Sequence, residues 1–311
     1  MPSILDHIGR TPLVPLRRLA AGLRAPVLVK CEHLNPGGSV KDRIAAAIVA
    51  DAEARGLLGP GATLIEATAG NTGVGLALVA AARGYALCCV MPEKMSIDKR
   101  RALTALGAEV IVTANAPPSH PDNFRNLARR LADERGWFLT DQFNNPANVR
   151  VHAKTTAVEL LEQTGGRIAA FVAGAGTGGT LSGVGACLKR HVPGVRIILA
   201  DPIGSCLAEW VLTGRLGPDG AYAVEGIGGS EAPANLHRAV IDGAERVSDD
   251  ESFAAARRLI RDEGLLVGGS AGTNVAAALR IAARGDLDGP VVTVLPDAWD
   301  RYRSCAWLRD P

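Results

Sequence analysis

The sequence has little net charge, no long apolar run and no regular cysteine spacing. Its 34 basic and 32 acidic side chains leave a formal net charge of +2, and no basic tract interleaved with aromatic residues is present. This balance argues against a nucleic-acid binder. No apolar run approaches the roughly 20 residues that cross a bilayer, and the start, MPSILDHIGR, lacks the regions of a signal peptide. We therefore expect a cytoplasmic globular protein that binds neither nucleic acid nor membrane.

The cysteines indicate neither disulfides nor a metal site. None of the six forms a CxxC pair, and the six histidines show no ligand spacing with them. A disulfide framework or a structural zinc is therefore not expected, and we assign no metal. The cysteines are interpreted as buried free thiols in a reducing compartment.

What the sequence does contain is an alternation of short β-branched runs with longer alanine-rich stretches over 311 residues. The expected strands are Val27–Lys30, Thr63–Glu66, Ala86–Met91, Glu109–Thr113, Trp137–Thr140, Ile168–Ala173, Val195–Ala200 and Val291–Leu295. The expected helices are Lys41–Leu57, Asn71–Arg83, Asp98–Leu106, Asp122–Glu134, Pro146–Gln163, Thr180–His191, Asp250–Glu263 and Thr273–Arg284. Such alternation predicts an α/β fold with parallel sheet covered on both faces.

The number of strands favours two α/β lobes. We place their boundary near FNNPA, which gives lobes 1–145 and 146–311, with the segment up to about residue 35 able to pack with the second lobe. Residues 212–231 and 114–121 are expected to be loops, since glycines fill the first and three prolines the second.

The first chemical motif is NPGGSVKDR, residues 35–43, between a strand and a long helix. Ser39 is expected to be the N-cap of that helix. Lys41 then lies in the first turn, where the helix dipole disfavours a cation and so favours an amine that can act as a nucleophile or form an imine. A surface lysine at a frayed helix start is the alternative. The chain has only six lysines, and Lys41 is the one that lies in a loop of this kind.

Three glycine-rich loops also follow expected strands and precede expected helices. They are EATAGNTGVG (66–75), GAGTGGT (174–180) and GGSAG (268–272). Small residues leave backbone N–H groups bare at a helix N-terminus, which suits an anion. Each loop alone is also explained by a tight turn or an N-cap serine. In an open α/β sheet, however, the carboxyl ends of the strands share one crevice.

The loop at 174–180 also resembles the GxGxxG signature of dinucleotide-binding proteins. The acidic partner expected about 20 residues further on would be Asp201, which comes slightly late and precedes a proline. Two threonines among the glycines fit a monophosphate at least as well.

Seven ordered motifs together resemble the cysteine synthase and cystathionine β-synthase family, the fold-type II pyridoxal-phosphate (PLP) enzymes. They are NPGGSVKDR, TAGNTG, MPEKMS, DQFNNPAN, GTGGT, EGIG and GGSAG, and the resemblance extends from IGRTPLV near the start to LPD near the end. It implies the two-lobed, tryptophan synthase β-like architecture of mostly parallel twisted sheets. It also implies PLP as cofactor and a homodimer.

The resemblance implies a role for each matching residue. Lys41 would hold PLP as an internal aldimine and move the α-proton, Asn71 would bind the phenolic oxygen, and Ser270 would face the pyridine nitrogen. The phosphate would be held by Gly176, Thr177, Gly178, Gly179 and Thr180. The substrate would be bound by Thr68, Ala69, Gly70, Thr72, Gln142 and Gly226.

The implied reaction is β-replacement in amino-acid biosynthesis. Because a serine stabilises a pyridinium less than a carboxylate does, loss of a β-leaving group is favoured. O-acetyl-L-serine or L-serine would lose its β-substituent, and sulfide or homocysteine would add to the aminoacrylate to give L-cysteine or L-cystathionine. The enzyme would be a transferase or lyase.

Three departures from the family pattern bear on the substrate. Ala69 replaces a serine, Ala153 and Lys154 follow His152 where the family has a tyrosine and then an acid, and Ala298 replaces another serine. We leave His152 unassigned, because a core histidine is a sufficient explanation for it.

Other functions remain open. They are elimination as in serine and threonine dehydratases, β-replacement with a non-standard nucleophile in specialised metabolism, a non-catalytic PLP-fold binding protein, and a nicotinamide-dependent oxidoreductase. The last fails to explain Lys41.

Overall fold

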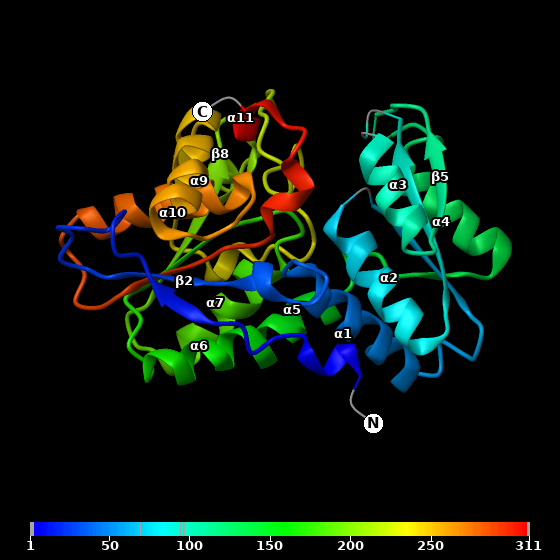
Figure 1. Ribbon diagram of the computed structural model, residues 1–311, viewed down its shortest axis with the longest axis horizontal. Coiled ribbons are helices and arrows are strands. Elements are labelled where there is room, and N and C mark those ends of the chain that lie inside the picture. Colours follow the sequence, from blue (N-terminus) through cyan, green and yellow to red (C-terminus); the bar gives the residue numbers. More distant parts are fainter. Residues whose placement is uncertain (1–2, 69, 94, 96, 118, 310–311) are drawn as a thin grey trace. The chain divides into compact units, whose positions relative to one another are not determined.

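The computed structural model describes residues 3–68, 70–93, 95, 97–117 and 119–309. Figure 1 follows the chain from the N-terminus to the C-terminus. The chain divides into two compact units: unit 1 comprises residues 1–8 and 35–147, and unit 2 comprises residues 9–34 and 148–311. The fold is α/β, with one mostly parallel sheet in each unit.

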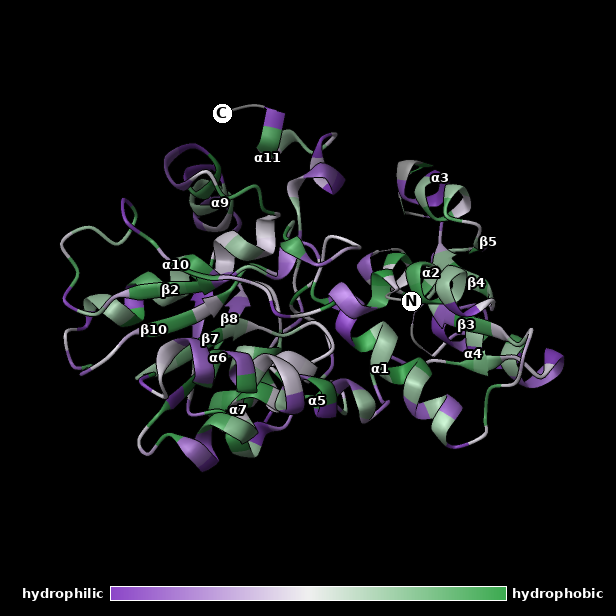
Figure 2. Ribbon diagram, turned by 60° about the horizontal axis from the view of Figure 1, so that its bottom comes forward, coloured by the Kyte–Doolittle hydropathy of each residue, from purple (hydrophilic) through white to green (hydrophobic). Residues whose placement is uncertain are grey.

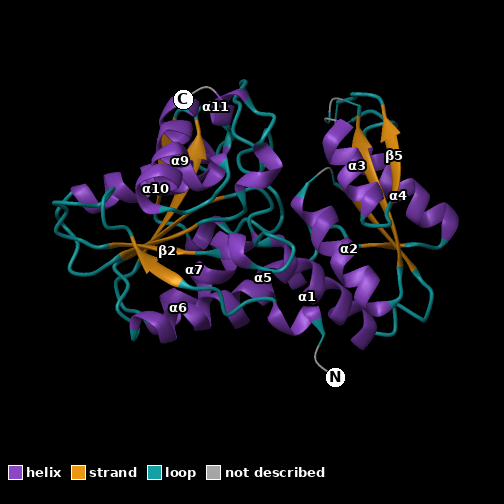
Figure 3. Ribbon diagram, in the orientation of Figure 1, coloured by secondary structure: helices purple, strands orange, loops and turns teal. Residues whose placement is uncertain are grey.

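Unit 1 contains a four-stranded sheet in the order β5-β4-β3-β6, and every adjacent pair is parallel. Its elements are η1 (Ile4–His7), α1 (Lys41–Ala54), β3 (Thr63–Ala67), α2 (Asn71–Arg83), β4 (Ala86–Pro92), α3 (Ile97–Ala105), β5 (Glu109–Thr113), α4 (Phe124–Arg135) and β6 (Phe138–Leu139). Helices cover both faces of the strands (Figure 3).

Unit 2 contains a six-stranded sheet in the order β1-β2-β10-β7-β8-β9, parallel except for β1 against β2. Its strands are β1 (Leu13–Pro15), β2 (Val27–Lys30), β7 (Ala170–Gly174), β8 (Arg196–Pro202), β9 (Gly243–Val247) and β10 (Val291–Val294). Its α-helices are α6 (Ala157–Thr164), α7 (Gly179–His191), α8 (Leu207–Thr213), α9 (Asp249–Glu263), α10 (Gly269–Ala283) and α11 (Ala306–Arg309). The short helical turns are η2 (Glu32–Leu34), η4 (Arg238–Val240) and η5 (Trp299–Tyr302). Helix α5 (Ala147–Val151) joins the two units and continues into η3 (His152–Thr156), a π-helical turn.

The inner strands are mostly apolar because each sheet is buried on two sides. Along β7, Ala170 and Val172 face a core formed with α9 and α10, whereas Phe171 and Ala173 face a second core formed with α6 and α7. The apolar colouring of these strands and of the helices beside them is visible in Figure 2. Successive side chains of a strand point to opposite faces, so a two-sided core requires a continuous apolar run.

Several sequence expectations need correction. Strands β1 and β9 and helix α8 were not expected. The helix expected at 146–163 is three segments, because the π-helical turn η3 separates α5 from α6. Helix α10 begins at Gly269 rather than at Thr273, which places Ser270 in its first turn.

Among the described residues, no helix is long and apolar enough to span a membrane.

Candidate functional site

Lys41 opens helix α1 in unit 1. The N-cap is Val40 rather than the expected Ser39, and the Ser39 Oγ accepts a hydrogen bond from the Lys41 N–H at 3.2 Å. The buried Asp42 carboxylate accepts from the Gly37 N–H at 2.5 Å. The Ser39 and Asp42 side chains therefore hold the loop that precedes α1. They fix the position of the Lys41 backbone at the start of the helix.

The start of α2 lies beside Lys41. A Cβ built on Gly75 would lie 3.0 Å from the Lys41 carbonyl oxygen. Glycine at this position therefore lets the backbones of the two helices pack closely. Asn71 is the first residue of α2 and lies one turn before Gly75. The helix that begins at Asn71 therefore packs against the helix that begins at Lys41.

The described residues between β3 and α2 are Thr68 and Gly70. The buried Thr68 Oγ1 accepts from the Gly70 N–H at 3.3 Å. Gly70 is the N-cap of α2, and no side chain of the described residues caps that helix. A Cβ on Gly70 would meet no atom within 4 Å. Ala69, assigned to substrate binding from the sequence, lies outside the described residues.

Gln142 joins this loop through its side chain. The Thr72 hydroxyl donates to the Gln142 Oε1 at 2.6 Å, and both side chains are buried. Unit 1 therefore places Thr68, Gly70, Thr72 and Gln142 around the loop that follows β3. The Thr68 hydroxyl and the backbone N–H groups at the start of α2 are donors suited to a carboxylate, whereas the Thr72 hydroxyl gives its hydrogen to Gln142 and so orients that amide.

A buried carboxylate, Glu66, holds Gln142 in place. Its Oε2 accepts from the Gln142 backbone N–H at 3.1 Å, and its Oε1 accepts from the Gln142 Nε2 at 3.4 Å. The Thr140 hydroxyl also donates to Oε2. Burial raises the pKa of Glu66 to about 7, although these hydrogen bonds oppose the rise. Glu66 therefore changes its charge within the physiological range.

In unit 2, residues 176–180 form the turn from β7 into α7. Gly178 is the N-cap of α7 with φ +85°, and a Cβ there would lie 2.6 Å from the Leu236 Cα, so only glycine fits. No side chain of the described part of the chain caps this helix. A Cβ on Gly176 would collide with the Gly226 carbonyl oxygen, so the loop that contains Gly226 lies directly against this turn.

Ser270 lies in the first turn of α10, and a neighbouring asparagine fixes that turn against the end of β7. The Asn274 Oδ1 accepts from the Gly174 N–H at 2.7 Å, and its Nδ2 donates to the Val294 carbonyl at 2.8 Å. Ser270 is itself buried. Unit 2 therefore places Gly226 against residues 176–180, and it fixes the helix that carries Ser270 to the end of β7.

Asp201 does not suit the dinucleotide interpretation. Its side chain is 0% exposed, and its Oδ2 accepts from the Ala208 N–H at 2.7 Å at the start of α8. A ribose-binding carboxylate has to reach the ligand, whereas this one is committed to the helix beside it.

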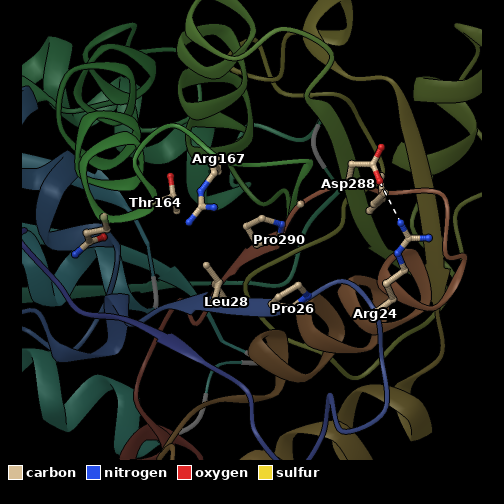
Figure 4. A pocket seen from close by; sticks show the side chains of 10 residues that line it. Arg24, Pro26, Leu28, Thr164, Arg167, Asp288 and Pro290 are labelled. Carbon is tan, nitrogen blue, oxygen red and sulfur yellow. Dashed lines mark hydrogen bonds and ion pairs between the residues drawn. The ribbon is translucent and has the colours of Figure 1, made fainter.

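A cavity of about 610 Å³ in unit 2 contains none of the candidate residues. Pro26, Leu28 and Pro290 line it where β2 and β10 begin, together with Arg167 (Figure 4). The candidate turns follow the other ends of the strands, and ligands of open α/β sheets bind at those carboxyl ends.

The comparison with known proteins decides the family. The model of the family described as "Pyridoxal-phosphate dependent enzyme" matches residues 4–297. The chain belongs to this family. It is a PLP-dependent enzyme of the α/β architecture that the resemblance implied, with PLP as its cofactor.

The PLP-dependent relatives include three that cover nearly the whole chain. Cystathionine beta-synthase of Apis mellifera is 47% identical over 306 residues, which are 97% of this chain and 60% of that protein. Cysteine synthase of Staphylococcus aureus (strain Mu50 / ATCC 700699) is 43% identical over 303 residues, covering 97% of this chain and 95% of the relative. The crystal structure of O-ureido-L-serine synthase superposes with a TM-score of 0.92 at 40% identity, covering 100% of this chain and 96% of that one. The chain thus spans little more than half the length of the cystathionine beta-synthases it matches.

The residues present fit PLP. The uncapped start of α7, with the hydroxyls of Thr177 and Thr180 beside it, offers only donors to a phosphate. The amine of Lys41 is the group that forms an imine with an aldehyde. We therefore retain the sequence assignments as proposals for how this enzyme holds its cofactor.

Sequence reasoning missed the side chains that hold the candidate residues. Glu66 was noted only as the start of a motif, and Asn148 only as the end of another. Asn148 donates from Nδ2 to the Thr177 Oγ1 at 3.0 Å, and the His152 Nε2 lies 3.2 Å from the Thr180 Oγ1. The spacing of four residues between Asn148 and His152, on one side of a helix, was the available signal.

Proposed function

We propose that this enzyme catalyses a β-replacement on O-acetyl-L-serine or L-serine with a thiol nucleophile, sulfide or homocysteine. The products are L-cysteine or L-cystathionine. The observation that carries the proposal is the cluster in unit 1: Lys41 packs beside the helix of Asn71, and Thr68, Thr72 and Gln142 surround a loop suited to a carboxylate. An amino acid presents that carboxylate next to the carbon that reacts.

Each residue has a stated task in this proposal. PLP, when bound, withdraws electrons from the α-carbon of the amino acid. Lys41 holds the cofactor and takes the α-hydrogen as a proton on Nζ. Thr68, Thr72 and Gln142 orient the carboxylate.

The other assignments concern the cofactor. Asn71 would donate to its ring hydroxyl oxygen, residues 176–180 would bind its phosphate, and the Ser270 hydroxyl would lie at its ring nitrogen. A neutral hydroxyl, rather than a carboxylate, at that nitrogen favours departure of the β-substituent. The thiol then adds to the β-carbon and releases its proton.

The test begins with the visible absorption of the purified protein. Addition of O-acetyl-L-serine without a thiol is expected to shift the absorption band of the bound cofactor, and sulfide or homocysteine is expected to restore it. A band that ignores O-acetyl-L-serine but shifts with L-serine assigns L-serine as the donor. Rapid release of pyruvate without a thiol would instead show a dehydratase-like elimination.

Lysine variants provide the control. Lys41→Ala is expected to abolish both the visible band and turnover. Lys189→Ala removes a lysine that forms an ion pair with Asp242 on the surface of unit 2, and both properties are expected to stay unchanged. Equal behaviour of the two variants would contradict the assignment of Lys41.

A non-standard nucleophile is the second candidate, and the similarity to O-ureido-L-serine synthase favours it. O-ureido-L-serine carries oxygen rather than sulfur on its β-carbon. A competition assay with sulfide, homocysteine and an N-hydroxyurea as nucleophiles separates the two candidates by product mass. A homodimer and a cytoplasmic location stay predictions, which the elution volume in gel filtration and cell fractionation test.

A further inference from the structure

Two buried side chains, those of Asn148 and His152, lie one helical turn apart. They contact Thr177, just before α7, and Thr180, in the first turn of α7. Asn148 in α5 donates from Nδ2 to the Thr177 Oγ1 at 3.0 Å. His152, the first residue of the π-helical turn η3, places its Nε2 3.2 Å from the Thr180 Oγ1. Asn148 is 0% exposed and His152 is 1% exposed, so both side chains are buried.

The approach of α7 to this segment is tight. A Cβ on Gly183 would lie 2.8 Å from the His152 Cβ and would collide with the Val149 carbonyl oxygen. Glycine at this position lets the backbone of α7 come close enough for the His152 ring to reach Thr180. The contact is therefore built into the packing of the two elements.

With a phosphate bound at residues 176–180, hydrogen-bond accounting favours one direction for this contact. A phosphate has only acceptor oxygens at neutral pH, and a threonine hydroxyl has one hydrogen to donate. If Thr180 donates to the His152 Nε2, that hydrogen is lost to the phosphate. If Nε2 carries the ring hydrogen and donates, the Thr180 hydrogen stays available.

The second ring nitrogen agrees with this direction. The His152 Nδ1 lies 3.0 Å from the Thr156 Oγ1, a hydroxyl that can donate to it. Asn148 repeats the pattern, because it also presents an N–H to a threonine oxygen. In the tautomer with the hydrogen on Nε2, His152 donates to the Thr180 Oγ1 as Asn148 donates to the Thr177 Oγ1.

We propose that His152 is a positioning residue for the PLP phosphate: its neutral ring donates from Nε2 to the Thr180 Oγ1 and directs the Thr180 hydroxyl hydrogen to the phosphate. The inference rests on the proposed assignment of residues 176–180 to that phosphate. It gives a function to a histidine that core packing alone would explain.

The test measures PLP affinity by titrating the apoprotein with PLP. His152→Leu removes the donor, and PLP is expected to bind about tenfold more weakly. His152→Gln keeps an N–H near the Nε2 position and is expected to stay within about threefold of the wild type. Thr180→Val is expected to weaken binding at least as much as His152→Leu.

The double variant His152→Leu/Thr180→Val separates positioning from general damage. Since His152 acts through Thr180, the double variant is expected to bind PLP as Thr180→Val does. Additive losses would overturn the proposal. So would wild-type affinity in His152→Leu with weak binding in Thr180→Val. Wild-type affinity in Thr180→Val would instead overturn the phosphate assignment, and this inference with it.

Nitrogen-15 NMR of the histidine ring in the wild-type holoenzyme gives an independent readout, which decides the question even where a variant fails to fold. The neutral Nε2–H tautomer is expected for His152. A neutral Nδ1–H tautomer, or a ring protonated at both nitrogens at pH 8, would overturn the proposal.

Discussion

The two units hold their candidate turns by different chemistry. In unit 1, the residues assigned to the substrate are held by the carboxyl of Glu66, which is buried and has a pKa raised to about 7. In unit 2, the threonines assigned to the phosphate are held by the Asn148 amide and the His152 ring. A site that binds a dianion gains from neutral donors below it, whereas a buried carboxylate there would repel the ligand. A change of pH should therefore affect the residues assigned to the substrate, through the charge of Glu66, more than the residues assigned to the phosphate.

Removal of the Glu66 carboxylate should have the largest effect. Glu66→Leu leaves the Thr140 hydroxyl and the N–H groups of Gln142 without this acceptor inside the protein. The free energy of unfolding is expected to fall by about 3 kcal/mol, and kcat/KM by roughly 100-fold. Urea unfolding and steady-state kinetics measure these losses. Glu134→Leu, on the exposed surface of α4, serves as the control and is expected to change stability by less than about 0.5 kcal/mol.

Glu66→Gln should remove the pH dependence while keeping much of the structure. In the wild type, the pKa of Glu66 is raised above 4.5, so the native state binds more protons than the unfolded state between about pH 4.5 and pH 7. Stability relative to Glu66→Gln should therefore fall as the pH rises through this window, by up to about 3 kcal/mol, and level off above it. Asp141 and the Cys89 thiol also face Glu66, so Asp141→Asn is the variant that tests for their contribution. Parallel stability curves for the wild type and Glu66→Gln would contradict the prediction.

A carboxylate introduced in unit 2 should make PLP binding depend on pH, so that the two units no longer differ in this respect. Asn148→Asp puts a titratable group against Thr177, where the phosphate is assigned. PLP is expected to bind about tenfold more weakly at pH 8 and to recover affinity as the pH falls, because the buried carboxylate repels a dianion only when ionised. Asn148→Ala loses the same hydrogen bond without adding charge, and its PLP affinity should not vary with pH in this way.

The smallest effects should separate the two sets of threonines. Thr72→Val removes the hydroxyl that donates to Gln142, and we expect the amino-acid substrate to bind about fivefold more weakly with unchanged PLP affinity. Thr177→Val should show the reverse. Titrations of the visible band with PLP and with substrate distinguish the two outcomes, and equal effects on both ligands would show that the assignments do not separate.

The sequence predicted the inner strands of both sheets and the edge strands β5 and β6 of unit 1, but it missed β1 and β9, the edge strands of unit 2. Strands β4 and β7 are apolar runs with both faces in a core, so composition alone marks them. Strand β1 has three residues and ends in proline, and β9 reads GAERV with a half-exposed pattern. Both lie at the edge of their sheet, where burial imposes no continuous apolar run.

The candidate site divides in the same way. The turns could be predicted, since glycine, hydroxyl and lysine residues at strand ends carry a recognisable pattern. The side chains that hold the turns could not, because Glu66 and His152 meet their partners only through tertiary packing. Glu66 reaches Gln142 from 76 positions away in the chain, and His152 reaches Thr180 from 28 positions away. A local pattern marks at most the holding residue, as the four-residue spacing of Asn148 and His152 does, and does not mark its distant partner.

The path of the chain between the units has a consequence for synthesis on the ribosome. Strand β2 lies between β1 and β10, and β10 begins only at Val291. Unit 1, by contrast, is complete once Ala147 has emerged. The first strands made must therefore wait, with one edge unpaired, until nearly the whole chain has been translated, while unit 1 folds in the interval. During that time β2 presents an unpaired edge at which wrong strand pairing can occur.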